Sequence, residues 1–353
     1  MPGVVGPLKR QLRSAVSDAT LAASVHNSQP WHFTMIAQGV AVRVDPTLRP
    51  RIIDRQGRWL LQSLGAAIAN LELGMRVRTG RTTRTQVFPD LDPHEAGAAS
   101  GATATLTGAV VAVVEIADDA RGDPLDDRLH TAILERRTSR GPLYGDLEAA
   151  AWDTVMAAAS AAGDGWHIRA LRPDPAQTAA LVDLTRAVEA RWRDDVAYLA
   201  EVQRWTKPDG GRGIPPTLIG PGDPSGNVPR REFAVSPTSP RRAPAPSGDT
   251  AAPSTDVFEV SPRLLVLAGA PDGPTTWVRA GAAMQRAMLA ATAEEARVGF
   301  LGQVVEDDEA RARAGDLLSL RDEALLQVLR LGAVDPTRHP RRSPRRPLRE
   351  VLG

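Results

Sequence analysis

Two apolar segments of this chain carry the same small-residue pattern. Residues 61–67 read LQSLGAA and residues 277–283 read WVRAGAA, so that Gly65 corresponds to Gly281. Each segment continues as an apolar helical pattern and is followed by a strand pattern rich in Val or Leu. A glycine beside two alanines allows a second helix to approach closely. The repeat predicts a degenerate internal duplication, in which two α+β units pack as a dimer fused into one chain.

The repeat and a change of composition divide the chain into three parts. We expect a first half over residues 1–120 and a second half over residues 121–206 and 256–353. Residues 207–255 form an irregular insert dense in Pro and Gly, which is typical of a lid or a disordered segment. Low complexity favours disorder over Val235–Thr255. The order of elements does not match a doubly wound fold, and no Gly-x-Gly-x-x-Gly follows a strand, so the predicted class is α+β.

Periodicity predicts the individual elements. Helices are expected at 8–23, 58–78, 129–140, 148–162, 177–205 and 277–296. Strands are expected at 33–36 and 40–44 as a hairpin, and at 105–116, 166–171, 263–268 and 325–331.

Composition excludes several classes of function. The formal net charge of +1 does not favour nucleic acid, and the absence of Cys removes disulfides, thiolate metal sites and cysteine nucleophiles. Among the six His only His26 and His32 are close in sequence, and their spacing is unlike a zinc motif, so no metal is expected. No window approaches eighteen uninterrupted apolar residues and no signal peptide is apparent. We expect a cytoplasmic protein without a membrane partner.

The segment 22–33, which reads AASVHNSQPWHF, connects a helical pattern to a strand pattern. Its Ser, Asn and Gln side chains can donate and accept hydrogen bonds at once, which suits the edge of a planar heteroaromatic ring. The alternative is an Asx-type turn with a buried Trp anchor. A second polar segment, 136–140, reads RRTSR. Guanidinium groups on both sides of a hydroxyl indicate a phosphate clamp, with a solvated basic helix end as the alternative.

These motifs resemble those of a known family. Asn27–Trp31 (NSQPW) with Phe33 resembles the flavin-lining signature of the nitroreductase-like FMN flavoproteins, and the longer ASVHNSQPW form is similar to their single-chain, tandem Acg-type branch. The resemblance implies that the ring loop lines the flavin through Ser24, Asn27, Ser28 and Gln29. The 136–140 segment is similar to the family's Arg-x-Ser-x-Arg/Lys element, which implies phosphate contacts from Arg136, Thr138 and Arg140.

Two shorter motifs extend the resemblance. Residues 299–303 (GFLGQ) stand where the family brings backbone N–H groups to flavin N5 and O4, which implies cofactor contacts at Leu301 and Gly302; a helix C-cap at Gly299 is the alternative. Residues 343–348 (SPRRPL) resemble the closing Arg-x-Pro-Leu segment, which implies that Arg345 reaches the phosphate. The other arginines of the tail read as a solvated basic surface.

The resemblance also implies a composite site. In homodimeric members the ring loop and the phosphate element of one site come from different subunits, and here they fall in different halves. The second half has Asp164–His167 (DGWH) where NSQPW is required, so we expect one FMN per chain in a monomeric pseudo-dimer.

The implied activity is that of a nitroreductase-type FMN oxidoreductase. It would pass electrons from NAD(P)H through FMN to a small-molecule acceptor such as a nitroaromatic or a quinone. The flavin carries this chemistry, so no catalytic side chain is expected. A non-catalytic FMN storage or sequestration protein with a lid-covered flavin is the main alternative, and a flavin-free interaction protein using the basic tail is a third.

Overall fold

Two four-stranded antiparallel sheets build the protein, and their strands follow the same order. The computed structural model describes residues 6–90, 108–120, 123–160, 168–207, 209–220, 223, 225–229, 231, 258–334 and 341–353. The first sheet has the order β1-β2-β4-β3, with β1 (Trp31–Ile36), β2 (Gly39–Val44), β3 (Arg81–Val87) and β4 (Val110–Ala120). The second has the order β5-β6-β8-β7, with β5 (Ile168–Leu171), β6 (Arg263–Gly269), β7 (Arg297–Phe300) and β8 (Ala324–Gly332).

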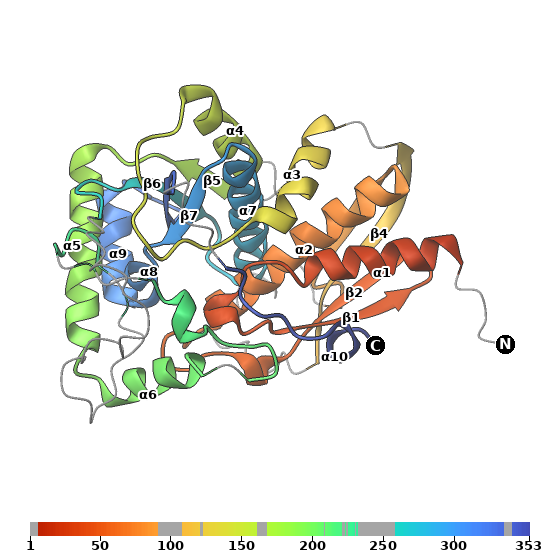
Figure 1. Ribbon diagram of the computed structural model, residues 1–353, viewed down its shortest axis with the longest axis horizontal. Coiled ribbons are helices and arrows are strands. Elements are labelled where there is room, and N and C mark those ends of the chain that lie inside the picture. The colour runs from red at the N-terminus through yellow and green to blue at the C-terminus, as the bar shows by residue number, and fades with distance from the viewer. Residues whose placement is uncertain are drawn as a thin grey trace, which may run out of the picture.

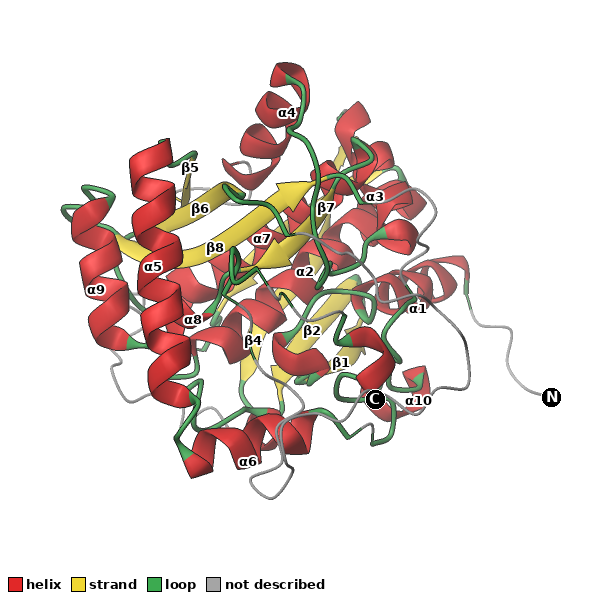
Figure 2. Ribbon diagram, turned by 60° about the vertical axis from the view of Figure 1, so that its left-hand side comes forward, coloured by secondary structure: helices red, strands yellow, loops and turns green. Residues whose placement is uncertain are grey.

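Helices separate and cover the sheets (Figure 1). They are α1 (Pro7–Ala19), α2 (Arg58–Thr79), α3 (Pro124–Glu135), α4 (Ala149–Ser160), α5 (Pro175–Trp192), α6 (Val196–Trp205), α7 (Pro274–Ala293), α8 (Gln303–Glu306), α9 (Asp308–Leu317) and α10 (Leu348–Val351). Helix α2 packs on the first sheet and α7 on the second, and the two helices pack on each other. Figure 2 shows α5 and α9 side by side outside the second sheet. In the described part of the chain, no helix is both long and apolar enough to cross a bilayer.

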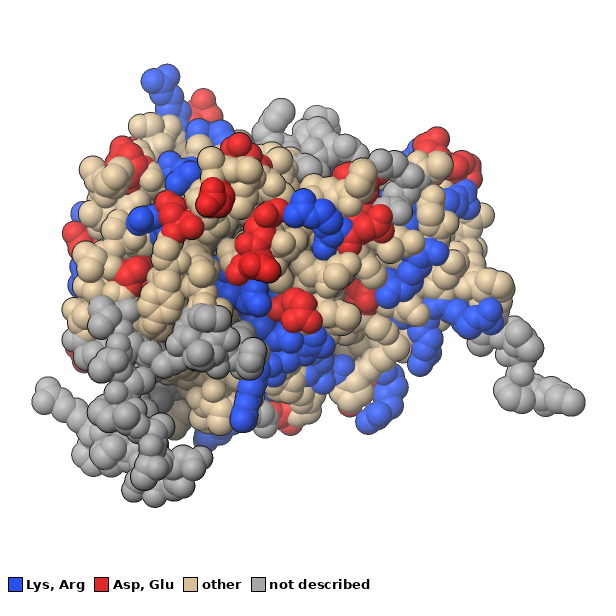
Figure 3. All heavy atoms as spheres, turned by 45° about the horizontal axis from the view of Figure 1, so that its top comes forward, with Lys and Arg blue, Asp and Glu red and all other residues tan. Residues whose placement is uncertain are grey.

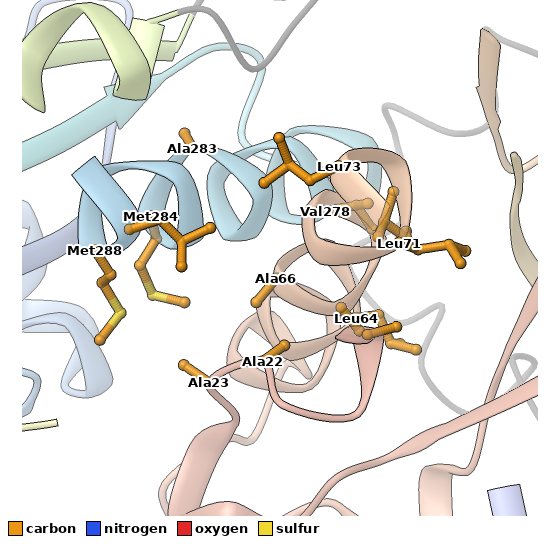
Figure 4. Packing of buried hydrophobic residues seen from close by; sticks show 14 of the residues in the cluster. Ala22, Ala23, Leu64, Ala66, Leu71, Leu73, Val278, Ala283, Met284 and Met288 are labelled. Atoms are coloured by element: carbon orange, nitrogen blue, oxygen red, sulfur yellow. The ribbon is translucent and has the colours of Figure 1, made fainter. Parts of the chain in front are cut away.

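The centre of the core is the crossing of α2 and α7 (Figure 4). A Cβ built on Gly65 would lie 1.8 Å from the carbonyl oxygen of Val278, and one built on Gly281 would lie 1.9 Å from that of Gln62. Each glycine therefore faces the main chain of the other helix, which confirms the close helix contact that the repeated sequence predicts. Both helices are buried almost all round, because sheets and neighbouring helices surround them.

The end of the chain returns to the first sheet. Leu352 forms a parallel bridge with Phe33 on β1, and the N–H of Gly353 donates to the carbonyl of Phe33 (2.9 Å). Helix α10 packs on β1 as well, and Figure 1 shows the C-terminus beside that strand. The C-terminal segment thus covers the exposed edge of the first sheet, which is formed by β1.

Several predicted elements are confirmed and others are corrected. The hairpin of β1 and β2 pairs as expected. The single helix predicted at 177–205 is wrong: it is two helices, because Asp195 accepts hydrogen bonds from the N–H groups of Ala197 and Tyr198 and starts α6. The helix predicted at 129–140 ends at Glu135. Residues 105–107, 161–162, 166–167 and Val235–Thr255 lie outside the described residues, as does Asp164–His167.

The sequence pattern does not predict strands β3 and β7, and both lie at sheet edges. Strand β3 is largely polar and partly exposed, so it lacks the apolar pattern of a central strand. Strand β7 has only four residues. Strand β4 also continues four residues beyond the predicted end. Edge position removes the periodic burial on which sequence prediction depends.

Candidate functional site

Two adjoining cavities lie where the loop before β1 meets the segment that follows α3. The first holds about 980 Å³ and is lined from the loop before β1, from α2, α7 and β8, from the β7–α8 connection and from the insert. The second holds about 1360 Å³ and is lined from the segment after α3 and from the C-terminal segment. Both are lined by Ala23, Ser24, Thr138, Ser139 and Arg140. These shared residues make the two cavities one elongated site.

The second cavity carries an arginine cluster, which consists of Arg136, Arg137, Arg140, Arg342 and Arg345. The cavity is lined by no Asp or Glu among the described residues. Burial, followed by repulsion from Arg345 and the other arginines, lowers the pKa of Arg136 to about 9. Burial, followed by repulsion from Arg342 and Arg137, lowers the pKa of Arg345 to about 10. The buried guanidinium groups of Arg136 and Arg345, with no carboxylate among the described lining residues, favour the binding of an anion. Figure 3 shows positive side chains gathered near the middle of one face.

The guanidinium groups of Arg136 and Arg345 retain unused donors. Arg136 is 5% exposed and donates from Nη2 to the carbonyl of Leu21 (3.2 Å), while its Nε and Nη1 have no partner among the described residues. Arg345 donates to the carbonyls of Leu21 and Ala22 (3.2 and 3.3 Å), and its Nε has no described partner. Planar donors left unpaired in a buried cavity match the oxygens of a phosphate.

The clamp segment is extended and not helical. Arg136 has φ −60° and ψ 127°, so α3 ends before it. Thr138 forms a bridge with Val298 of β7, and the N–H of Ser139 donates to the carbonyl of Val298 (2.8 Å). The segment therefore runs along β7 and brings Arg136, Thr138 and Arg140 to the cavity wall. This arrangement differs from the solvated helix end that was the alternative.

The ring loop has an unusual backbone. Residues Val25–Asn27 form a 3₁₀ turn, and His26, Asn27 and Gln29 have positive φ values of 47°, 56° and 53°. Three such non-glycine residues in one loop cost conformational energy. Side chains from both central helices hold the loop: the N–H of Val25 donates to Ser63 Oγ (3.0 Å), and that of Ala23 donates to Gln285 Oε1 (3.2 Å). These hydrogen bonds anchor the loop, and Ser24 of the loop lines both cavities.

The side-chain amides of the ring loop form hydrogen bonds with other parts of the protein. Asn27 Nδ2 donates to the carbonyls of Gly213 and Pro344 (3.0 Å each), and its Oδ1 accepts from Arg345 (2.9 Å). Gln29 Nε2 donates to the carbonyl of Gly211 (2.8 Å), and its Oε1 accepts from the N–H of Arg346 (2.9 Å). The loop is therefore tied to the insert and the C-terminal segment.

The predicted ring-loop residues take different places relative to the two cavities. Ser28 and Gln29 are fully buried and are not among the residues that line either cavity. Asn27 lines only the second cavity. Trp31, the anchor of the alternative turn, is fully buried. Ser24 is the one predicted loop residue that lines both cavities.

The β7–α8 connection contributes Gly302 but not Leu301. A Cβ on Gly302 would lie 3.1 Å from the indole of Trp59, so glycine leaves the first cavity open there. Leu301 is buried away from the cavity, and its N–H donates to the carbonyl of Val328 (3.0 Å). The N–H of Leu301, which the resemblance assigns to the flavin, is therefore already engaged in a hydrogen bond with the second sheet. Gly299 lies within β7, so the alternative of a helix C-cap is wrong.

Sequence prediction missed an ion pair from the insert. Arg231 Nη2 lies 2.6 Å from Glu306 Oε1, and Arg231 Nη1 donates to the hydroxyl of Tyr198 (3.1 Å). Both members of the pair are buried and line the first cavity. Burial opposes the charge on Arg231, but Glu306 and Tyr198 outweigh it and raise its pKa. No sequence signal marked Arg231, because it stands in an irregular segment.

His26 and two glutamines complete the first cavity. The imidazole of His26 packs edge-on against Trp205, with ring centroids 6.4 Å apart. Burial, followed by the charges of Arg231 and Arg140, lowers its pKa well below the usual value, so the ring is neutral near pH 7. Gln62 and Gln327 stand in apolar runs of α2 and β8. A polar residue inside such a run was the one sequence signal that could have identified them. No group of three or more metal-binding side chains occurs in the described residues.

Comparison with known proteins gives two relevant relatives from Mycobacterium tuberculosis. "Putative NAD(P)H nitroreductase Rv3131" is 27% identical over 291 residues, which span 81% of this chain and 74% of that protein. "Uncharacterized protein Rv3127" is 27% identical over 356 residues, which span 97% of this chain and 92% of that protein. No protein-family model matches the chain.

Among solved structures, a nitroreductase with bound FMN from Bacteroides fragilis has a TM-score of 0.36 and 15% identity. It covers 60% of this chain and 91% of its own. The sequence relationship is the stronger finding, because it extends over most of both chains. Relatives of that name confirm that this chain resembles the nitroreductase-like superfamily, as its motifs predict.

Proposed function

We propose that this chain is an FMN-dependent oxidoreductase of the nitroreductase type. It passes electrons from NAD(P)H through FMN to a nitroaromatic, a quinone or a similar small acceptor. The observation that carries the proposal is the junction of the two cavities, one rich in unpaired arginine donors and the other walled by Trp59, Phe300 and Met284. A phosphate at the arginine cluster would match the second cavity, and a planar ring would match the apolar walls of the first.

The residues present fit FMN. Arg136 and Arg345 have buried donors without a described partner, and Thr138 and Arg140 line the passage between the cavities. These four residues would hold the phosphate, while Ser24 and Gly302 would border the ring. When bound, the flavin supplies the centre that accepts and delivers hydride. The chain itself binds, orients and shields the ring, so no acid, base or nucleophile is assigned.

The two halves would form one site and not two. The loop with Ser24 comes from residues 1–120, while the arginine cluster comes from the second half, residues 121–206 and 256–353. The matching strand order of the sheets and the reciprocal contact of Gly65 and Gly281 support an origin as a fused dimer. We therefore propose one FMN per chain in a monomeric pseudo-dimer of the tandem Acg-type branch.

A second candidate function is storage or sequestration of FMN. Described residues of the insert, including Ile214, Val228 and Pro229, line the first cavity. Arg231 fixes the insert there through its buried pair with Glu306. An insert held in this way would act as a lid and would hinder a nicotinamide from stacking on the ring.

The test is the flavin content of the purified protein and its reduction by NADPH and then NADH in an anaerobic stopped-flow instrument. Near-equimolar FMN that bleaches rapidly supports the oxidoreductase. Equimolar FMN that stays oxidised with both donors supports sequestration. A protein that takes up no added FMN overturns both.

Two variants test the assigned site. Arg140→Ala removes a cavity donor, and Asn27→Ala releases the side chain of Arg345 from its hydrogen bond. Each should lower FMN occupancy, whereas Arg13→Ala on the exposed face of α1 should not. Full occupancy in both site variants would contradict the assignment.

A further inference from the structure

Two buried glutamines meet at the wall of the first cavity. Gln327 of β8 is fully buried, Gln62 of α2 is 1% exposed, and both line that cavity. Neither belongs to a motif that carries the resemblance to the nitroreductase-like superfamily. A buried primary amide has two donors and one accepting oxygen, and each needs a partner.

The hydrogen bonds of the pair determine which way each amide points. Gln62 Nε2 donates to the main-chain carbonyl of Leu326 (3.1 Å). A carbonyl can only accept, so the nitrogen of Gln62 must face Leu326 and its oxygen must face Gln327. Gln327 must then donate Nε2–H to Gln62 Oε1, as the structure has it. Turning either amide over would place two oxygens or two donors face to face.

This orientation of the two amides leaves one acceptor without a hydrogen-bond partner. Gln327 Oε1 is buried and accepts no hydrogen bond from any residue that the structure describes. The donors that might rotate toward it are constrained, since Gln62 is bound to Leu326. A buried acceptor without a partner is costly, so the occupant of the cavity is expected to supply an N–H or O–H group.

The position of Gln327 narrows the choice of donor. It lines the first cavity and is not among the residues shared with the second cavity or in the arginine cluster. If the phosphate lies at the arginine cluster, the ribityl chain passes the shared residues and the ring fills the first cavity. The oxidised isoalloxazine ring has a single N–H, at N3.

We propose that Gln327 is a specificity-determining residue whose Oε1 accepts the N3–H of the flavin pyrimidine ring, with Gln62 as the positioning residue that holds the amide in that orientation. This inference rests on the proposed function, because it requires the ring to occupy the first cavity. It adds a reason why the site would select a ring with a donor at that position.

The test compares FMN with 3-methyl-FMN, which has no donor at N3. Each is titrated into apoprotein, and its dissociation constant is measured by flavin fluorescence. Wild-type protein is expected to bind 3-methyl-FMN at least about tenfold more weakly than FMN, since the methyl group leaves Gln327 Oε1 unpaired. Equal affinity for the two flavins in the wild type overturns the inference, and this arm needs no variant.

A variant separates the lost hydrogen bond from a steric effect of the methyl group. Gln327→Ala removes the acceptor and makes room, so it should bind FMN more weakly and discriminate between the flavins less than about threefold. Tenfold discrimination that persists in Gln327→Ala overturns the inference. Gln86→Ala is the matched control, because Gln86 is an exposed strand glutamine, and its discrimination should equal that of the wild type.

The two proposals fail differently. Wild-type apoprotein that binds neither flavin contradicts the proposed function. Wild-type protein that binds FMN and 3-methyl-FMN equally well contradicts only the assignment of Gln327.

Discussion

Gly65 of α2 and Gly281 of α7 each face the main chain of the other's helix. The two contacts are nearly equal, since added Cβ atoms would lie 1.8 Å and 1.9 Å from the opposing carbonyl oxygens. This reciprocal contact supports the proposed origin as a fused dimer. The pair supports the cavities directly, because Gln62 and Ser63 on α2 and Met284 on α7 line the first one.

Gly65→Ala should separate α2 from α7. The new Cβ would meet the main-chain carbonyl of Val278, which cannot rotate away. We therefore expect the free energy of unfolding to fall by about 3 kcal/mol or more. Urea denaturation gives this value. Gly315→Ala is the control, because nothing lies within 4 Å of its Cβ and alanine favours helix; it should be neutral or slightly stabilising. A small loss in Gly65→Ala, similar to the control, would contradict the close contact.

Arg136→Met should have opposite effects on binding and on stability. The variant loses a buried phosphate donor, so FMN should bind about 10- to 100-fold more weakly. The apoprotein should melt at the same temperature or higher, because an uncompensated buried charge has been removed. Fluorescence titration and thermal melting without flavin measure the two effects. Arg13→Met should change neither, and unaltered FMN affinity in Arg136→Met would exclude Arg136 from the site.

His26 should make the protein sensitive to mild acid. Its pKa in the folded state is well below 6.5, so between that value and 6.5 the unfolded chain binds more protons than the folded chain. Stability contributed by the neutral ring is therefore present above pH 6.5 and falls as the pH drops below it. Asp54 acts in the opposite direction, because burial raises its pKa to about 6.

The variant His26→Asn isolates this effect. Asparagine does not titrate and tolerates the left-handed backbone at this position. Between pH 7 and pH 5.5 the wild type should lose about 1 kcal/mol more unfolding free energy than the variant, as measured by urea denaturation at both pH values. Parallel losses in the two proteins would show that His26 titrates normally.

Arg231 and Glu306 should be strongly coupled. Arg231→Met leaves a carboxylate buried without its partner and should cost about 3–5 kcal/mol, while adding Glu306→Gln should recover part of that loss. A double-mutant cycle in urea measures the coupling. Arg186→Met with Asp183→Asn, an exposed pair on α5, is the control and should show coupling below about 1 kcal/mol. Additive effects at Arg231 and Glu306 would mean that the pair does not hold the insert.

Much of the fold was accessible from sequence, because buried helices and central strands carry regular apolar patterns. The hairpin of β1 and β2 and the repeated helices α2 and α7 were predicted for this reason. Strands β3 and β7 were not, since edge strands have weak patterns. The break before α6 depended on a capping side chain, Asp195, whose effect is local and easily outweighed.

The motifs identified segments that line the two cavities, but not the direction of every side chain in them. The sequence by itself determined that 22–31 and 136–140 carry polar groups suited to a ligand, and that the segments around Gly65 and Gly281 share a small-residue pattern. Only the tertiary structure decided that Asn27 and Gln29 bind main chain from distant segments. It also decided that Arg231 and Gln327 join the site. Periodicity and composition record local preference, whereas these contacts depend on which remote carbonyl or carboxylate comes close when distant segments pack together.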